Sequence, residues 1–392
     1  MDSAADTVSG QFELNADQRA IQEMAQSFAD ERVAPHALEW DRESRFPADV
    51  IRETGPLGFG GIYVGEDHGG SGLKRLDAVL VFEALARACP AFSSFISIHN
   101  MGAWMIDRFG NEEQRSRFLP RLTSMEWLAS YCLTEPGSGS DAAALKTRAV
   151  RSGGNGSDFV VNGAKQFISG AGDSDVYVTM VRTGAEGPKG ISTLVIPKDA
   201  PGLSFGALEH KMGWNMQSTR QVIFEDCKVP AENLLGDEGI GFRIAMAGLD
   251  GGRLNIAACS LGGAQAALEK AVAYSGERKA FGQPINQFQA LQFKMADMAT
   301  ELEAARLFLY AAASRLDRRD PEASKWSAMA KRFVTDVGFS VANEALQMHG
   351  GYGYLHDYGV EKLVRDLRVH QILEGTNEIM RVIIARHILA GQ

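Results

Sequence analysis

The chain changes its residue pattern twice, and this change constrains the fold more than any single motif. From residue 16 to about residue 121, apolar residues such as Ile21, Met24 and Phe28 recur at steps of three to five. Between about 129 and 230 short β-prone runs alternate with Gly, Asn, Asp and Pro turns, and helical spacing returns after residue 241. The sequence therefore predicts a helical region, a strand-rich region and a second helical region.

These regions predict an α+β protein of three domains, with boundaries at residues 1–127, 128–239 and 240–392. The expected strands are residues 159–161, 175–181, 191–196 and 221–224. Strands at this spacing without helices between them favour a small antiparallel barrel or sandwich.

The third region carries two apolar seams at steps of three and four, which are typical of helices packed in an antiparallel bundle. The seam residues are Leu291, Met295, Met298, Leu302, Ala305 and Leu309, then Trp326, Met329, Phe333 and Val337. The polar stretch 315–321 interrupts the pattern, and Pro321 is suited to the start of the next helix. We interpret the seam residues as core.

The composition excludes several classes of protein. A chain of 392 residues with 45% hydrophobic content is long enough for two or three cores and lacks the composition of a disordered protein. The net charge is −9 and the basic residues are dispersed, which argues against nucleic-acid binding. An anionic cofactor remains compatible, because one arginine or a few backbone N–H groups suffice to bind a phosphate.

The four cysteines (Cys89, Cys132, Cys227 and Cys259) are widely spaced, so neither a zinc site nor a disulfide framework is indicated. No apolar run reaches the length of a membrane span. Residues 1–15 contain three acids and no arginine, unlike a signal or transit peptide. We expect a cytoplasmic bacterial protein or, for a processed organellar enzyme, a mitochondrial matrix protein, with no metal and no membrane partner.

Glu374 stands immediately before a Gly-Thr break and an apolar C-terminal helix. Gly375 lets the backbone approach a ligand closely, and Thr376 or Asn377 can cap the helix. The local residues leave two interpretations open. Glu374 is either a catalytic base or an ordinary acid in the first turn of a helix, where the macrodipole favours it.

The segment 131–141 (YCLTEPGSGSD) is a polar, glycine-rich loop that offers backbone N–H groups and hydroxyls to a ligand. Together with the Glu374 segment it resembles the flavin-binding loop and catalytic-base segment of the acyl-CoA dehydrogenases. Residues 167–169, 278–282, 347–351 and 365–366 match further segments of that family in the same order. Residues 248–253, 350–355 and 369–374 look most like the valine-pathway members, which act on isobutyryl-CoA.

The resemblance implies a helical, β-barrel and four-helix-bundle architecture and an FAD-dependent dehydrogenation of an acyl-CoA thioester. Removing hydrogens from two adjacent carbons requires a base and a hydride acceptor, and no side chain accepts a hydride. In the family, flavin N5 accepts the hydride, the Glu374 position supplies the base, and the Glu374 N–H with a flavin hydroxyl stabilises the thioester oxygen. Burial under substrate and flavin should raise the pKa of Glu374 towards neutrality.

Gly252 distinguishes subgroups of the family. In a few members the base is a Glu directly before the arginine that matches Arg253, and here that position is Gly252. The resemblance therefore implies that Glu374 is the base, as in the short, medium and isobutyryl types. Arg253 then holds the Glu374 loop or lines the substrate region; the alternative is a surface arginine on a helix.

The remaining site residues follow from the resemblance. It implies FAD contacts by Tyr131, Leu133, Thr134, Gly139, Ser140, Phe167, Ile168, Ser169, Arg278, Phe281, Phe288, Gln289, Gln347, Met348, Gly350, Gly351, Thr376, Asn377 and Glu378. It implies substrate contacts by Ser140, Asp250, Gly251, Gly252, Arg253 and Arg386. Phe167 stands where many members have tryptophan, so an aromatic ring is kept beside the flavin.

Arg278 and Phe281 are implied to reach the FAD of a neighbouring subunit, with Phe288, Gln289 and the 347–351 turn in the same cross-subunit site. A homo-oligomer, most simply a tetramer, follows, with bundle seams buried between subunits. His349 is interpreted as a packed or hydrogen-bonding residue.

The expected reaction is isobutyryl-CoA to methacrylyl-CoA, with electrons passed to an electron-transfer flavoprotein. A 2-methylbutyryl- or butyryl-CoA dehydrogenase is the nearest alternative, because one methylene in an apolar pocket is worth only about 1–3 kcal/mol. An oxygen-using oxidase or monooxygenase, or a non-catalytic binding protein, is the alternative from another class. For the acyl pocket we expect residues 95–101 and the tip at 352–354.

Overall fold

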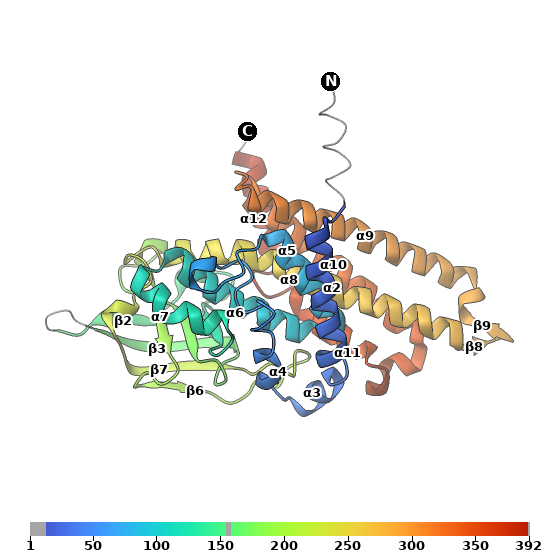
Figure 1. Cartoon of the computed structure of the whole chain (residues 1–392), viewed down its shortest axis with the longest axis horizontal. Helices are drawn as coiled ribbons and strands as arrows, with labels where there is room; N and C mark the ends of the chain where they lie inside the picture. Colours follow the sequence, from blue (N-terminus) through green and yellow to red (C-terminus); the bar gives the residue numbers. More distant parts are fainter. Residues whose placement is uncertain (1–12, 154–157, 391–392) are drawn as a thin grey trace, which may run out of the picture.

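The computed structural model of the chain describes residues 13–153 and 158–390. Most of the N-terminal segment 1–15 on which the expectation about targeting rests lies outside these residues. Figure 1 shows the β-sheet at one end of the long axis and the β8–β9 hairpin at the other, with long helices running between them. No helix of the described residues is long and apolar enough to span a membrane.

The N-terminal region is helical, as predicted. Its helices are α2 (Ala16–Phe28), η1 (Ala29–Val33), α3 (Ala37–Glu43), α4 (Ala48–Arg52), η2 (Glu66–His68), α5 (Arg75–Ala88), α6 (Pro90–Phe109) and α7 (Glu112–Thr123). Asn15 begins α2 by accepting a hydrogen bond from the Gln18 N–H at 2.8 Å. Ala25 and Ala29 face the core, whereas Met24, which the spacing placed there, is 38% exposed. The buried stripe follows the small residues that let α2 approach α5.

The middle region forms one seven-stranded sheet. Its strands are β1 (Ala129–Cys132), β2 (Arg148–Arg151), β3 (Phe159–Ser169), β4 (Val176–Arg182), β5 (Ile191–Pro197), β6 (Leu203–Phe205) and β7 (Thr219–Val229). The short helices η3 (Ala142–Ala144), η4 (Pro188–Gly190) and η5 (Ala231–Asn233) lie between or after them. All four expected strands are confirmed.

The middle region is the predicted β domain, and its sheet is mixed, because two of its strand pairs are parallel and not antiparallel as expected. Its strand order is β1-β4-β2-β3-β7-β6, with β5 paired to β4. The β1–β4 and β2–β4 pairs are parallel and the other pairs are antiparallel. The long chain between β1 and β4 allows this crossover, which a two-residue hairpin could not make.

The C-terminal region forms the expected helical bundle. Its elements are α8 (Gly241–Glu277), β8 (Lys279–Ala280), β9 (Gln283–Pro284), η6 (Ile285–Gln287), α9 (Gln289–Asp317), α10 (Ala323–His349), η7 (Gly350–Tyr354), η8 (His356–Tyr358), α11 (Val360–His370) and α12 (Asn377–Ala390). The seam of α9 is buried at Met298, Leu302 and Leu309. On α10 only Val337 of the predicted seam is fully buried, because Ala and Ser positions beside the seam face α8.

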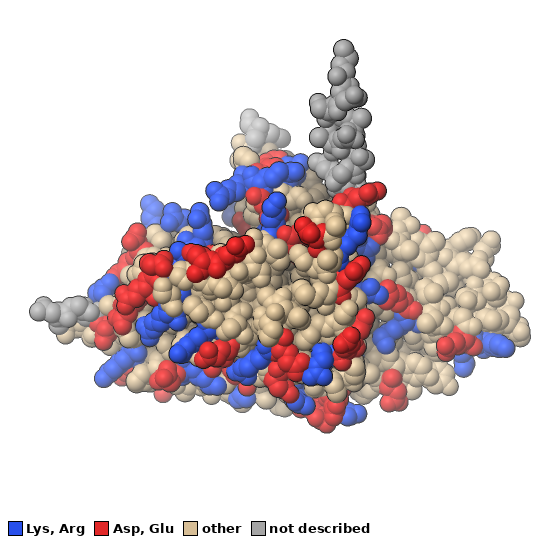
Figure 2. Space-filling view, viewed as in Figure 1, with Lys and Arg blue, Asp and Glu red and all other residues tan. Residues whose placement is uncertain are grey.

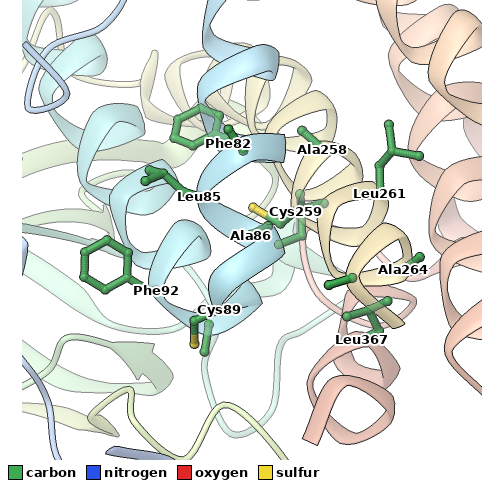
Figure 3. Packing of buried hydrophobic residues seen from close by; sticks show 14 of the residues in the cluster. Phe82, Leu85, Ala86, Cys89, Phe92, Ala258, Cys259, Leu261, Ala264 and Leu367 are labelled. Atoms are coloured by element: carbon green, nitrogen blue, oxygen red, sulfur yellow. The ribbon is translucent and has the colours of Figure 1, made fainter. Parts of the chain in front are cut away.

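The main core lies where α5 and α6 pack on α8. Figure 3 shows Ala86 of α5 next to Cys259 of α8, with Phe82 and Leu261 in the same cluster. The two helices approach closely at Gly262, where an added Cβ would lie 2.1 Å from the Glu83 carbonyl oxygen. Glycine is therefore required at this crossing.

All four cysteines are free and buried. Two lie in the main core and two, Cys132 and Cys227, lie in the core of the sheet. Burial raises the pKa of the Cys132 and Cys259 thiols to about 12 and that of Cys227 to about 11. These thiols are therefore poor nucleophiles in the folded protein.

Charged side chains of both signs are interspersed over much of the surface. Figure 2 shows a largely uncharged stretch at the end of the molecule that carries α9 and the β8–β9 hairpin. Exposed apolar residues at this end are Val272, Phe281 and Phe293.

Candidate active site

Glu374 lies in a strained turn between α11 and α12. Its φ is 54° and that of Gly375 is 89°, a conformation that a residue other than glycine rarely adopts. Thr376 Oγ1 accepts a hydrogen bond from Ile379 N at 3.3 Å, which confirms the predicted cap of α12. Because Glu374 precedes Asn377, the first residue of α12, the interpretation as a first-turn helix acid is wrong.

The turn directs the Glu374 carboxylate onto α8. A Cβ added to Gly252 would lie 2.3 Å from Glu374 Oε2, so only glycine leaves room for this carboxylate. The same Oε2 atom is buried and has no hydrogen-bond partner. Burial raises the pKa of Glu374 to about 7, against the opposing positive charges of Lys331, Arg253 and Arg75.

The backbone of the turn also presents a free donor. The Glu374 N–H donates to no acceptor within the described residues. The arrangement therefore combines an unpartnered carboxylate oxygen, poised to take a proton near neutral pH, with an adjacent N–H that can stabilise a developing oxyanion.

Arg253 is buried beside this carboxylate, so the alternative of a surface arginine is wrong. Its side chain is 6% exposed, and Nη1 donates to Asp250 Oδ1 at 2.7 Å. Arg253 Nε is buried without a partner. No hydrogen bond joins Arg253 to the Glu374 turn among the described residues, and its positive charge acts on the Glu374 carboxylate.

Three residues of the N-terminal region join the site, and sequence reasoning missed them. Arg75 Cζ lies 3.5 Å from the centroid of the Tyr63 ring and 5.3 Å from that of Trp104. A Cβ on Gly251 would lie 2.5 Å from Arg75 Cζ. The next residue, Gly252, is the one that faces the Glu374 carboxylate. Nothing local in the sequence signals this cluster, because packing of α5 and α6 on α8 brings it together.

Lys331 of α10 is a further residue that sequence reasoning missed. It is fully buried, and Nζ donates to Gly375 O at 2.8 Å and to Asn377 Oδ1 at 2.9 Å. In the sequence it reads as an ordinary polar position of a helix. The seam of neighbouring apolar residues gives no sign that a lysine contacts the Glu374 turn.

The loop after β1 borders the same site. Tyr131 Oη is buried without a partner, and the nearby Glu374 carboxylate contributes to raising the pKa of this phenol above its usual range, although burial is the main cause. Glu135 anchors the loop by accepting from the Lys146 and Thr147 N–H groups at 2.6 and 2.9 Å and from Lys165 Nζ at 2.8 Å. Sequence reasoning assigned no role to Glu135, although its carboxylate fixes the loop.

The tip of the loop is open. A Cβ on Gly137 or Gly139 would meet no atom within 4 Å, and Ser140 is exposed. Leu133 and Ile168 are buried side chains of the sheet region, so they can face a ligand only through their backbone or edge. An anchored loop with an open glycine tip fits the binding of a phosphate-bearing cofactor such as FAD.

Phe167 projects from the sheet beside this loop. Its φ is 59° and its side chain is 64% exposed, at a register shift between Lys165 and Ile168 in the β3–β7 pair. Bulges of this kind turn a side chain outward next to active sites. The carbonyl of Ser169 accepts from Ser130 Oγ at 2.6 Å, so the backbone of this segment is tied to β1. The open aromatic face fits a planar flavin.

A second group of predicted residues lies far from Glu374, at the other end of α8. Arg278 is about 39 Å along the helix axis from Gly252, at about 1.5 Å per residue. Phe281 is 97% exposed at the tip of the hairpin and contacts Phe288 edge to face at 6.0 Å. Arg278 and Phe281 therefore cannot reach the Glu374 site of their own chain. A contact with the site of a neighbouring subunit requires such a distant position.

The turn after α10 belongs to this distal group. Gln347, Gly350 and Gly351 are exposed, as is Gln289 at the start of α9, whereas the Met348 side chain packs in the main core. His349 stacks on Tyr274 at 4.5 Å and its Nδ1 bonds the Ala345 carbonyl oxygen, which confirms a packing role.

The expectation for the acyl pocket needs a correction. The tip at 352–354 does not approach Glu374, because Tyr352 lies 6.5 Å from Tyr274 near the far end of α8. Residues 95–101 of α6 are almost all buried in the cores, and Met101 lies 3.4 Å from a Cβ placed on Gly248, one turn before Gly252. Only this end of the segment is near the site.

The last predicted residues lie in α12. The Asn377 side chain is buried and bonded within the protein, so it has no group left for a cofactor. Glu378 pairs with Arg381 at 3.3 Å on the surface, and Arg386 is exposed.

Comparisons with known proteins place this geometry in a family. The chain matches the family models "Acyl-CoA dehydrogenase, N-terminal domain" at residues 15–126, "middle domain" at 130–227 and "C-terminal domain" at 239–389. It is 59% identical to the mitochondrial isobutyryl-CoA dehydrogenase of Dictyostelium discoideum and 55% identical to that of Bos taurus, in each case over 96% of this chain and 90% of the relative.

The solved butyryl-CoA dehydrogenase of Megasphaera elsdenii has a TM-score of 0.93 and 38% identity to this chain, covering 96% of this chain and 99% of that one. The buried glutamate, the anchored glycine loop and the outward aromatic thus occur on a fold shared along the whole chain. The chain belongs to the acyl-CoA dehydrogenase family, whose members are flavoprotein oxidoreductases acting on the CH–CH group of acyl-CoA.

Proposed function

We propose that the protein dehydrogenates a short branched acyl-CoA, isobutyryl-CoA to methacrylyl-CoA, with Glu374 as the base. The observation that carries the proposal is the buried Glu374 Oε2, which has no partner and belongs to a carboxyl with a pKa of about 7. The two isobutyryl-CoA dehydrogenases at 59% and 55% identity support this acyl group.

The residues of the chain divide the work of proton abstraction. Glu374 Oε2 accepts the α-proton, and the free Glu374 N–H donates to the thioester oxygen as negative charge develops there. The cations of Lys331, Arg253 and Arg75 favour the ionised carboxylate before it takes the proton. Gly252 leaves the space in which the carboxylate and the α-carbon can meet.

The open loop tip at residues 137–140 and the exposed face of Phe167 would hold FAD, with Tyr131, Thr134 and Ser169 beside them. Bound FAD would supply the acceptor for the β-hydrogen and its electron pair. Arg278, Phe281 and the 347–351 turn would complete the FAD site of a neighbouring subunit in a homotetramer. We also propose that Ser140, Asp250 and Arg386 contact the acyl-CoA substrate.

We further propose that an electron-transfer flavoprotein receives the electrons. Two relatives are described as mitochondrial, so the protein would work in the mitochondrial matrix if its source is a eukaryote and in the cytoplasm if its source is a bacterium.

Anaerobic bleaching of the flavin absorbance tests the proposal on the purified holoprotein. Isobutyryl-CoA should bleach the flavin faster than 2-methylbutyryl-, butyryl- or isovaleryl-CoA, and Glu374→Gln should lose at least about a thousandfold in rate, as loss of a general base predicts. Glu53→Gln is the control, because Glu53 is a surface carboxylate of the N-terminal region that pairs with Arg32 at 2.7 Å.

Each other outcome is decisive. Preference for another acyl-CoA would overturn the valine-pathway substrate but keep the dehydrogenase, and bleaching that survives in Glu374→Gln would remove Glu374 as the base. Absence of bleaching by every thioester would overturn dehydrogenation. Rapid reoxidation of the reduced flavin by air would favour the oxidase alternative over electron transfer to a flavoprotein.

A further inference from the structure

The Glu374 turn needs support, because its backbone is strained. Glu374 and Gly375 both have positive φ, and a non-glycine residue holds such a conformation only where its surroundings over-determine it. The supports come from one face of α10. Lys331 bonds the Gly375 carbonyl, and Asp336 Oδ1 accepts from Gln371 Nε2 at 2.8 Å on the other side of the turn.

Asn377 links these supports. Its Oδ1 accepts from Lys331 Nζ at 2.9 Å, and its Nδ2 donates to Asp336 Oδ1 at 2.7 Å and to Thr335 Oγ1 at 3.0 Å. The turn is therefore fixed before and after Glu374. Among the described residues Lys331 is the only cationic side chain that donates a hydrogen bond to residues 374–377, and it forms no salt bridge there.

The charge of Lys331 also faces the base. Burial lowers the pKa of Lys331 itself to about 7, and the charges of Glu374, Asp336 and Glu378 oppose this shift, whereas that of Arg253 adds to it. Lys331 is the first of the positive charges that oppose the effect of burial on Glu374. The buried Lys331 ammonium has no bonded carboxylate, and the buried Glu374 carboxylate has no bonded partner. The two opposite charges therefore compensate each other across the turn.

We propose that Lys331 is the positioning residue of this active site: its hydrogen bonds to Gly375 and Asn377 hold the Glu374 carboxylate and N–H in place, and while it is protonated its charge favours the ionised carboxylate. The proposal rests on Glu374 being the base. Lys331 itself touches no reacting atom, so it acts only through the turn.

Two substitutions separate the hydrogen bonds from the charge. Lys331→Met removes both, whereas Lys331→Gln keeps an N–H donor and removes the charge. Lys325→Met is the control, because Lys325 lies on the same helix and pairs with Glu322 away from the turn. Flavin content and far-UV circular dichroism establish that each holoprotein is folded.

The first measurement is the rate of anaerobic flavin reduction by isobutyryl-CoA between pH 5.5 and 9. Lys331→Met should be about a hundredfold slower at pH 7, the cost of a misplacement of about 1 Å. Lys331→Gln should recover part of that loss. Both variants should show a pH profile moved upward by about one unit, because removing a nearby cation favours the protonated carboxyl.

The second measurement needs no substrate. Isotope-edited infrared difference spectra of the holoprotein against Glu374→Gln report the titration of the Glu374 carboxyl directly. Its midpoint should rise by about one pH unit in Lys331→Met and Lys331→Gln and stay unchanged in Lys325→Met.

The proposal is overturned if Lys331→Met keeps the wild-type rate and profile, or if the rate falls while profile and infrared midpoint stay unchanged, since a merely structural lysine would behave so. If Lys331→Met does not fold, Lys331→Gln decides by the same two criteria. If no thioester reduces the flavin of the wild-type protein, the proposed function is wrong. The infrared midpoint of the Glu374 carboxyl would still test the influence of Lys331.

Discussion

Glu374 combines a free carboxylate oxygen with a pKa near the pH of a cell, and the two properties have one cause. Enclosure of Oε2 against Gly252 removes both water and protein partners from that atom. The same enclosure penalises the charged form and raises the pKa.

This pKa fixes the direction of the pH dependence. A base abstracts a proton only when ionised, so the rate of flavin reduction should rise with pH, reach half its plateau near pH 7 and level off above pH 8. Stopped-flow reduction at saturating isobutyryl-CoA measures it. A profile that levels off already above pH 5 would mean that the carboxyl keeps its ordinary pKa and that the site is wetter than the structure shows.

Gly252 leaves no room for even the smallest added side chain. Alanine there would place Cβ 2.3 Å from Glu374 Oε2 and push the carboxylate away, so Gly252→Ala should reduce flavin about a hundredfold more slowly. The helix itself should tolerate alanine, which forms helix better than glycine by about 1 kcal/mol. Circular dichroism and stopped-flow rates test the two statements together. Gly276→Ala on the same helix, whose Cβ contacts only Asn286 Nδ2 at 3.5 Å, should keep the wild-type rate.

At the scale of elements, the crossing of α5 and α8 depends on Gly262. An added Cβ would lie 2.1 Å from the Glu83 carbonyl oxygen, and backbone atoms cannot rotate away as a side chain can. Gly262→Ala should therefore lower the free energy of unfolding by about 2–3 kcal/mol, the usual cost of overpacking. Urea unfolding measures it against Gly276→Ala. Equal midpoints for the two variants would show that the helices move apart without cost.

Local pattern predicted the elements whose own residues define them. The four runs rich in Val, Ile and Phe became strands, but the short segments β1, β2 and β6 were missed. Ala129–Cys132 has no regular alternation of apolar and polar residues, and β2 and β6 are only 4 and 3 residues long. The parallel pairing of β1 with β4 was also missed, since strand partners are set by tertiary packing and not by local spacing.

The residues of the candidate site also fall into two groups, those with a local sequence signal and those without one. Glu374, the 131–141 loop and Phe167 stand in segments with their own local signals, and the structure brings them to one region. Lys331 and Arg75 come from helices whose local pattern is ordinary. A buried cation on a helix looks like a solvated one until its neighbour is known.

At the scale of the whole molecule, the uncharged end at the β8–β9 hairpin is the predicted subunit contact. Phe281 is 97% exposed there, which is costly for a phenylalanine in an isolated chain. The holoprotein should be a homotetramer by light scattering. Phe281→Ser should keep the fold of each chain but lose bound flavin on gel filtration, measured by the ratio of visible to protein absorbance.

Val150→Ser provides the control for that experiment, because Val150 is exposed on β2 at the opposite end of the molecule. It should retain flavin and assembly. Full flavin retention in Phe281→Ser would place the contact elsewhere.

The positions of the four cysteines make them reporters of motion in the native protein. Cys89 and Cys259 lie in the helical core, and Cys132 and Cys227 lie in the sheet core, all sealed from solvent. An alkylating reagent can modify each thiol only when its own core opens. Mass spectrometry of the labelled peptides over time should therefore give two opening rates from unmodified protein. Equal rates would mean that the cores open together, and faster labelling of Cys132 and Cys227 would mean that the sheet opens first.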